Sequence, residues 1–524
     1  MKVCSISKGI RIERNRNRSM TTSCTRWNRL AILDCLVFHR ICPPSQLCRA
    51  SSRCIPPCNV RCTPFYTTTT SWRSSVIVAG EGRSANRTKW TSSNTTATVV
   101  EKEVLHDEGY ANHATSIIDS SVATVQTLFQ EIDGLVQFNL HRVQRAFRAA
   151  RIGPHHFAGS TGYGHGDLGR EALDQVMAEV MGAQAAAVRI QYVSGTHAIS
   201  SALYACLRPG DELLAVAGAP YDTLEEVIGL RGTPGHGSLK EWGVDYRKLD
   251  LVPSTGIIDW DALESAIVPG KTKVALIQRS CGYALRPTLS IADIERAVNI
   301  IKAQSNGQCI VVVDNCYGEF TDVKEPPAVG ADLCMGSLIK NPGGTIVSGG
   351  GYVAGRVDLV DRAVARMSAP GVGMDAGGVP GETLRLMFQG LFLAPQMVGE
   401  ALKGGRLVAE VMHRAGYRVI PAAGRCHPWS FITAVELNSS DKMQSFCSTV
   451  QSCCPVGSYV RPVPGVTPGY GDEVIFADGT FIDGSTAELS ADGPIREPYV
   501  VYCQGGTHWT HWRIVLEQCL PEIL

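Results

Sequence analysis

The sequence contains no uninterrupted apolar stretch of the roughly 18–20 residues that a membrane-spanning helix needs. Its longest candidate, residues 30–38, is broken by Asp34. We therefore predict a protein without a membrane span. There is no net charge either, since 49 basic residues match 49 acidic ones over 524 positions. With charged residues at 19% and apolar residues at 44%, the composition excludes a disordered or collagen-like chain.

Acids are nearly missing from the first hundred residues, which hold three of them against 16 Lys and Arg. This segment is rich in Ser and Thr and lacks the compact apolar core of a secretory signal, a composition typical of organelle transit peptides. We predict that residues 1–100 are a disordered leader that directs the protein to a chloroplast or mitochondrion. A leader without a targeting role and an Arg-rich arm that binds nucleic acid are the alternatives. We predict no nucleic-acid partner.

Paired metal ligands are also lacking. Eight of the 19 cysteines lie in the leader, where Cys54, Cys58 and Cys62 are spaced four apart. Zinc sites usually combine two close ligands with a second pair farther along, and no histidine follows here. We predict no metal site, and reduced thiols of an intracellular compartment.

The rest of the chain has clear periodicity. Apolar residues recur every three or four positions over residues 115–152, which predicts a helix that ends at Gly153-Pro154. Strands and helices then alternate, and continuously apolar strands indicate a mostly parallel sheet buried on both faces. Predicted strands are 187–193, 212–217, 274–279, 309–313 and 431–437; predicted helices are 170–181, 198–206, 291–304 and 402–415.

This pattern predicts an α/β fold with a large domain and a smaller α+β domain at the C-terminus. The predicted boundaries are an N-terminal helical segment at 101–170, a large domain at 171–395 and a small domain at 396–524.

A turn of small residues, Ser194-Gly195-Thr196, follows the first predicted strand and opens a helix. Small side chains let backbone N–H groups converge, and the helix N-terminus adds partial positive charge, so the turn suits a phosphate. An ordinary helix cap is the alternative, because Ser and Thr often begin helices.

Two other strand ends carry a carboxylate and an aromatic ring. Asp314 ends the strand 309–313, at the sheet edge where open α/β proteins bind ligands. Tyr221 follows the strand that ends at Ala217, and its ring could stack on a flat cofactor. A plain strand-ending Asp and a Tyr packed in the core are the alternatives.

Lys340 lies among small and apolar residues in the segment Ser337-Leu338-Ile339-Lys340-Asn341-Pro342-Gly343-Gly344. Desolvation should favour its neutral amine, the state that a nucleophilic lysine needs. An exposed lysine in a polar turn is the alternative. The order of phosphate turn, aromatic ring, Asp and Lys is the one expected for pyridoxal phosphate, which needs a Schiff-base lysine and an acid at its ring nitrogen.

Two competing motifs lack their required context. Residues 164–169 satisfy G-x-G-x-x-G, but no strand precedes them and no acid follows about 20 residues on. Residues 337–340 satisfy the S-x-x-K of penicillin-recognising enzymes without an S-D-N or K-T-G partner.

With these residues the chain resembles the fold-type I pyridoxal-phosphate enzymes of cysteine and methionine metabolism. It is most similar to the methionine γ-lyase-like and cystathionine β-lyase-like family known as aluminium-resistance proteins. The segments that carry the resemblance are Gly162-Tyr163-Gly164 with Gly169-Arg170, 194–199, 221–224, 278–280 with Arg286-Pro287, 337–344 and 488–496.

The resemblance implies a role for each matching residue. Lys340 would carry the internal aldimine, and Asp314 would pair with the pyridinium nitrogen. Tyr163, with Arg170, would complete the site of a neighbouring subunit in a homodimer or homotetramer. The remaining assignments are Tyr221 stacked on the ring, Ser194, Gly195, Thr196 and Ser337 at the phosphate, and Arg496 and Arg279 at the substrate.

The implied activity is a carbon–sulfur lyase that performs β- or γ-elimination on a sulfur-containing amino acid with pyridoxal 5'-phosphate. Two alternatives stay open. One is another reaction of the same cofactor, such as transamination or replacement. The other is a catalytically weak stress- or metal-tolerance protein that retains the fold.

Overall fold

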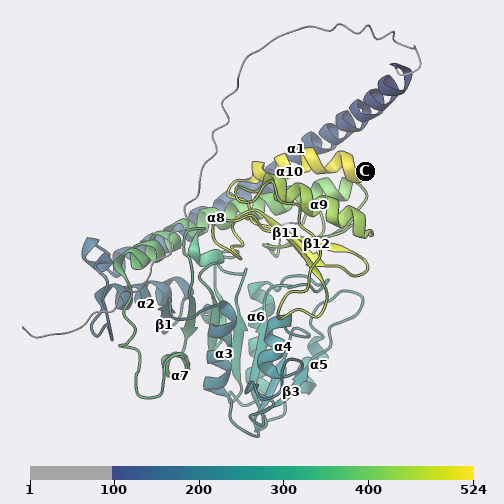
Figure 1. Cartoon of the computed structure of the whole chain (residues 1–524). Helices are drawn as coiled ribbons and strands as arrows, with labels where there is room; N and C mark the ends of the chain where they lie inside the picture. Colours follow the sequence, from purple (N-terminus) through teal and green to yellow (C-terminus); the bar gives the residue numbers. More distant parts are fainter. Residues whose placement is uncertain (1–96, 426) are drawn as a thin grey trace, which may run out of the picture. The chain divides into compact units, whose positions relative to one another are not determined.

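The computed structural model describes residues 97–425 and 427–524, with side chains from residue 112 onward. The predicted leader lies almost entirely outside the described residues, as do Cys54, Cys58 and Cys62. The described chain forms a seven-stranded sheet and a five-stranded sheet with helices packed on their faces (Figure 1). Among these helices, none combines the length and apolarity that a bilayer crossing requires.

The larger sheet is mostly parallel, as the sequence predicted. Its order is β1-β7-β6-β5-β4-β2-β3, and only β7 runs antiparallel to its two neighbours. The strands are β1 Ala185–Arg189, β2 Glu212–Ala215, β3 Asp245–Lys248, β4 Thr272–Gln278, β5 Ile310–Asp314, β6 Leu333–Ser337 and β7 Gly351–Gly355.

Ten α-helices and three short 3₁₀ turns complete the described residues. The α-helices are α1 Ala97–Ala149, α2 Leu168–Met181, α3 Gly195–Cys206, α4 Asp222–Ile228, α5 Trp260–Ala266, α6 Ile291–Gln304, α7 Val357–Met367, α8 Gly381–Arg414, α9 Ser440–Cys453 and α10 Trp509–Ile523. The 3₁₀ turns are η1 Pro154–Phe157, η2 Pro326–Val329 and η3 Asn341–Gly343.

Continuously apolar strands allow the large sheet to be covered on both faces. Along β5, Val312 packs with α3, α4 and α7, whereas Val311 and Val313 pack with α1, α2, α5, α6 and α8. Successive side chains of a strand point to opposite faces, so a strand without polar alternation needs two apolar layers. The sheet is therefore the middle layer of three.

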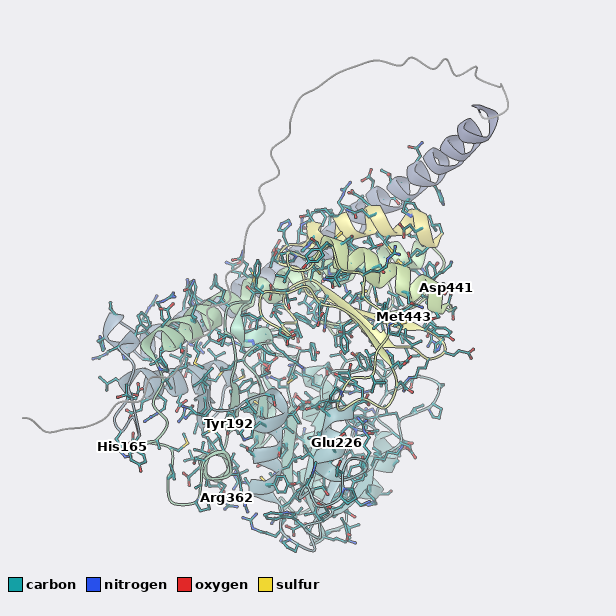
Figure 2. The ribbon with its side chains drawn as sticks, viewed as in Figure 1. His165, Tyr192, Glu226, Arg362, Asp441 and Met443 are labelled. Carbon is teal, nitrogen blue, oxygen red and sulfur yellow. The ribbon has the colours of Figure 1, made fainter. Side chains whose placement is uncertain are left out.

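The smaller sheet is antiparallel, in the order β10-β11-β12-β9-β8. Its strands are β8 Arg418–Ile420, β9 Thr433–Glu436, β10 Val474–Ala477, β11 Ser490–Pro494 and β12 Val500–Gln504. One face packs against α9, α10 and the end of α8, and Met443 of α9 in this layer is labelled in Figure 2. This sheet forms the core of the C-terminal part.

Helix α8 connects the two sheets and runs unbroken across the predicted boundary between residues 395 and 396. It lies beside α1, as Figure 1 shows. The sequence predicted only its second half, because Gly381, Gly390 and Pro395 interrupt the pattern of good helix formers. Gly390 is required by packing: a Cβ there would lie 2.4 Å from the carbonyl oxygen of Gly343.

We predict that Gly390→Ala destabilises the protein by about 1–3 kcal/mol, the usual penalty of overpacking, because backbone atoms cannot move aside as a side chain could. Denaturant unfolding measures the effect. Gly134→Ala in α1 is the control, since nothing lies within 4 Å of its added Cβ and Ala favours helix by about 1 kcal/mol over Gly. Equal unfolding free energies for the two variants would contradict the close contact.

Candidate active site

Three adjacent strands of the large sheet end in polar side chains at one edge. Gln278 at the end of β4 is the register partner of Asp314 at the end of β5, and Ser337 ends β6. The carboxyl ends of parallel strands share an edge, where α/β proteins bind ligands. The chain thus brings together at this edge two residues that the sequence assigned to the site, Asp314 and Ser337.

The N-terminus of α3 faces this edge. Ser194 caps the helix by accepting a hydrogen bond from the His197 backbone N–H at 3.1 Å. Gly195 follows it, and a Cβ there would lie 3.1 Å from the Cβ of Ser337. The space between Gly195 and Ser337 is therefore open only because residue 195 has no side chain. Helix N–H groups beside such a space favour an anion.

Tyr221 is fixed at both ends. Its backbone N–H donates to Oε1 of Gln278 at 2.7 Å, and its hydroxyl forms a 2.7 Å hydrogen bond with Oγ1 of Thr196. Burial, aided by the charge of Asp314, raises the pKa of Tyr221 above its ordinary value, so the hydroxyl keeps its proton at neutral pH. The ring is thus tied to both the turn at the start of α3 and the end of β4.

Lys340 lies three residues beyond the end of β6, immediately before η3, and its Nζ lies 4.0 Å from the ring centroid of Tyr317. Burial lowers the pKa of Lys340, whereas the charge of Asp314 raises it, and the net direction is upward. Tyr317, Cys316 and Tyr221 add to the rise only in their ionised forms. The prediction of a neutral amine counted desolvation alone; in the protein without a ligand, the charge of Asp314 acts in the opposite direction and favours the ammonium form.

Asp314 is the anionic neighbour of Lys340. Burial raises the pKa of Asp314 above its ordinary value, and the charge of Lys340 and hydrogen bonds from Cys316 offset part of that rise. One of these bonds runs from the Cys316 backbone N–H to Oδ1 at 3.1 Å. The pKa of Tyr317 rises to about 12 through burial, so this tyrosine is uncharged at neutral pH. The charge that remains to balance Lys340 is therefore that of Asp314.

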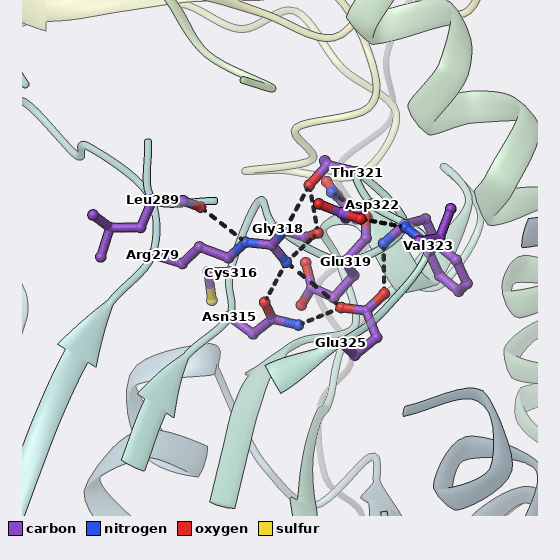
Figure 3. Close-up of polar contacts among 12 residues, drawn as sticks. Arg279, Leu289, Asn315, Cys316, Gly318, Glu319, Thr321, Asp322, Val323 and Glu325 are labelled. Carbon is purple, nitrogen blue, oxygen red and sulfur yellow. Dashed lines mark hydrogen bonds and ion pairs between the residues drawn. The ribbon is translucent and has the colours of Figure 1, made fainter. Parts of the chain in front are cut away.

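Arg279, assigned by resemblance to the substrate, lies within a network of protein hydrogen bonds (Figure 3). Its side chain is 2% exposed and approaches Glu325 to 3.6 Å. Its N–H groups donate to the carbonyls of Leu289 and Gly318 and to the side chains of Asn315 and Thr321. The guanidinium is thus occupied by the chain itself, and the structure does not bring it to Lys340.

Arg496 and Tyr163 are both exposed. The guanidinium of Arg496 is 56% exposed and pairs with Asp472 at 2.7 Å. Tyr163 is 74% exposed and stacks on His165, which Figure 2 shows at the periphery of the described chain. Any role of Tyr163 in a second subunit stays a prediction.

Arg170, its suggested companion, is 1% exposed. Its guanidinium donates to the carbonyls of Gly164 and Gly377 and pairs with Asp375 at 2.7 Å. Arg170 therefore holds the loop that carries Tyr163.

Several residues around Lys340 were not assigned from the sequence. Tyr317, Tyr283, Tyr470 and Asp492 are linked to Lys340 or to one another by charge, ring contact or hydrogen bond. Tyr317 follows Asp314 by three positions, which was a usable signal. The other three come from distant segments. The described residues contain no cluster of three or more His, Cys, Asp or Glu able to hold a metal.

The mostly parallel sheet, with Asp314 and the lysine at adjacent strand ends, defines the fold of the type I pyridoxal-phosphate enzymes. Within that class, the model of the methionine gamma-lyase family matches residues 114–524, and the chain belongs to this family.

Solved structures of similar proteins cover most of the chain. A carbon-sulfur lyase involved in aluminum resistance from Clostridium novyi is 40% identical with a TM-score of 0.75, covering 83% of this chain and 100% of its own. A Listeria monocytogenes protein, provisionally named as a cystathionine beta-lyase involved in aluminum resistance, is 42% identical with a TM-score of 0.75, covering 78% and 100%. The uncharacterized Bacillus subtilis protein YnbB is 46% identical over 389 residues, which is 74% of this chain and 91% of its own length.

We predict that Arg279→Met destabilises the protein by about 1–3 kcal/mol, because it leaves the buried acceptors of Asn315, Gly318 and Thr321 without their donor. Glu325 keeps its ion pair with Arg142 at 3.0 Å. Denaturant unfolding of the protein without added ligand measures this. Arg385→Met removes an exposed ion pair with Glu382 and serves as the control, with an expected loss below about 1 kcal/mol. Unchanged stability of Arg279→Met would instead favour a role at the substrate.

Proposed function

We propose that this protein is a pyridoxal-phosphate-dependent carbon–sulfur lyase that eliminates a thiol from a sulfur-containing amino acid by β- or γ-elimination. Its family consists of pyridoxal-phosphate-dependent lyases, and similar solved proteins carry carbon–sulfur lyase names. The observation that carries the proposal is the meeting of Lys340, Asp314, Tyr221 and the Gly195–Ser337 space at one sheet edge.

The residues of this edge fit the cofactor. The space beside Gly195, which a Cβ would narrow, suits a phosphate at a helix N-terminus. Ser194, Thr196 and Ser337 supply hydroxyls around it. A buried Asp314 suits a protonated ring nitrogen, and Lys340 is the group that would hold the cofactor covalently. When bound, pyridoxal phosphate supplies an electron sink for negative charge at Cα of an amino acid.

The charges of the chain's own groups explain how Lys340 can become a base. In the protein alone, Asp314 favours the ammonium form of Lys340. A cation at the ring nitrogen would engage Asp314 and weaken that effect, so that burial, which lowers the pKa of Lys340, gains influence. The Nζ of Lys340 can then take the proton from Cα of the substrate. Tyr221 retains its own proton and holds its position through Thr196.

The products of such an elimination are a thiol, ammonia and a 2-oxo acid, formed with one molecule of water. The homodimer or homotetramer, the organelle location and a substrate contact of Arg496 stay predictions. The geometry favours no second function over this one.

We predict that Lys340→Ala abolishes both the covalent attachment of pyridoxal phosphate and the release of thiol and 2-oxo acid. Absorbance spectra before and after borohydride, followed by peptide mapping, measure the attachment. Lys273→Ala, an exposed lysine of β4, is the control and should retain both. A Lys340→Ala protein that still traps cofactor and turns over substrate would end the assignment.

We predict that Gly195→Ala weakens pyridoxal-phosphate binding about 10- to 100-fold, the effect of one charge-assisted hydrogen bond. Its Cβ would occupy the space beside Ser337, and the backbone at 195 is not left-handed, so the effect is steric. Spectrophotometric titration of the apoprotein measures the affinity. Ser200→Ala, farther along α3, should bind normally, and normal binding by Gly195→Ala would place the phosphate elsewhere.

A further inference from the structure

The small sheet presents one carboxylate toward the large domain. Asp492 of β11 lies directly opposite Tyr502 of β12, and opposite residues of an antiparallel pair point to the same face. Tyr502 packs with Cys281 of the large domain, whereas its neighbour Cys503 packs under α9 and α10. The strand period therefore directs Asp492 away from the small domain's own core and toward the domain that carries Lys340.

Side chains from two segments face this carboxylate. Nε2 of Gln504 donates to its Oδ2 at 3.3 Å, and the side chain of Tyr283, in the loop after β4, interacts with the same group. Tyr283 is itself held, because the Tyr502 hydroxyl donates to its carbonyl at 2.7 Å and the ring of Tyr470 lies 5.7 Å away. Asp492 is thus positioned by both domains, and it remains partly accessible to solvent.

The surroundings of Asp492 let it exchange a proton near neutrality. Burial raises its pKa to about 7, with the charge of Asp478 acting in the same direction. The interaction with the Tyr283 side chain and the charge of Lys340 act in the opposite direction. That Lys340 affects this pKa places the two groups within electrostatic range of one another.

Other proton donors near Lys340 hold their protons more tightly. Burial raises the pKa of Tyr317 to about 12 and those of Tyr221 and Tyr283 well above the ordinary range. A thiolate produced by breaking a carbon–sulfur bond is a base comparable to a cysteine thiolate, whose conjugate acid has a pKa of about 8.5. A carboxylic acid that titrates near neutrality is a stronger acid than such a thiol, so proton transfer to sulfur is favourable.

We infer that Asp492 is the general acid that protonates the departing sulfur, an inference that rests on the proposed lyase function. As the carbon–sulfur bond breaks, its electron pair stays on sulfur, and the proton of the Asp492 carboxyl forms the S–H bond. Asp492 becomes a carboxylate that Tyr283 and Gln504 stabilise. Solvent returns its proton before the next turnover. Lys340 thus removes the proton from Cα, and Asp492 supplies the proton to sulfur.

Two substrates that differ only in leaving group test this role. S-methylcysteine releases a thiolate, which needs a proton, whereas β-chloroalanine releases chloride, which does not. Asp492→Asn keeps the size and the hydrogen-bonding capacity of the side chain. We expect it to lower kcat/KM for S-methylcysteine by about 10²–10⁴-fold, the usual contribution of a general acid, and to leave β-chloroalanine within about threefold.

Asp441→Asn is the matched control, because Asp441 lies at the exposed start of α9 (Figure 2) and should leave both substrates unaffected. A second measurement needs no turnover. Infrared difference spectra of the protein without substrate should show a carboxylic-acid carbonyl band that titrates near pH 7 and is missing from Asp492→Asn.

The outcomes separate this inference from the lyase function on which it rests. A wild-type protein that eliminates neither substrate and traps no cofactor on Lys340 would overturn both. An active wild type in which Asp492→Asn slows both substrates equally would overturn only the general acid. A loss of kcat/KM confined to substrates with a second ammonium group would also overturn only the general acid. Asp492 would then bind that ammonium group instead of protonating sulfur.

Discussion

The electrostatic coupling of two buried groups, the amine of Lys340 and the carboxyl of Asp314, is the constraint on which this site depends. Lys340 and Asp314 lie in surroundings that penalise either charge alone. Their strands are neighbours in the sheet, and the backbone after Lys340 is pressed against Gly390 of α8. A protein that keeps such a pair without a ligand is prepared to exchange one partner for a cofactor cation, and that exchange changes the basicity of the lysine.

Most residues of this edge could be predicted from the sequence, because each is identified by the strand or helix beside it in the chain. Asp314 ends a continuously apolar strand, and Gly195 and Thr196 open a helix directly after another. Lys340 stands in an apolar segment just after Ser337, the last residue of its strand. In a parallel sheet all carboxyl ends meet at one edge, so recognising the strands was enough to bring these residues together.

Residues whose roles depend on distant partners could not be predicted in this way. Arg279 lies in the same local context as a ligand-binding residue, yet its donors are used by Asn315, Thr321 and backbone carbonyls from other segments. Asp492 belongs to a short strand in a Gly- and Pro-rich tail that shows no clear period. Its position depends on how the second sheet packs against the first, which no sequence window contains. Likewise, the first half of α8 is stabilised by packing rather than by helix propensity.

Helix α8 packs against η3 beside Lys340 with its first half and against the small sheet with its second half. One helix therefore contacts both the segment that carries the amine and the sheet that carries Asp492. Pro395 lies between these halves, where the helix lacks one backbone hydrogen bond. A bend of a few degrees at Pro395 would move the acid relative to the amine, so leaving-group preference can change through residues that never meet a substrate.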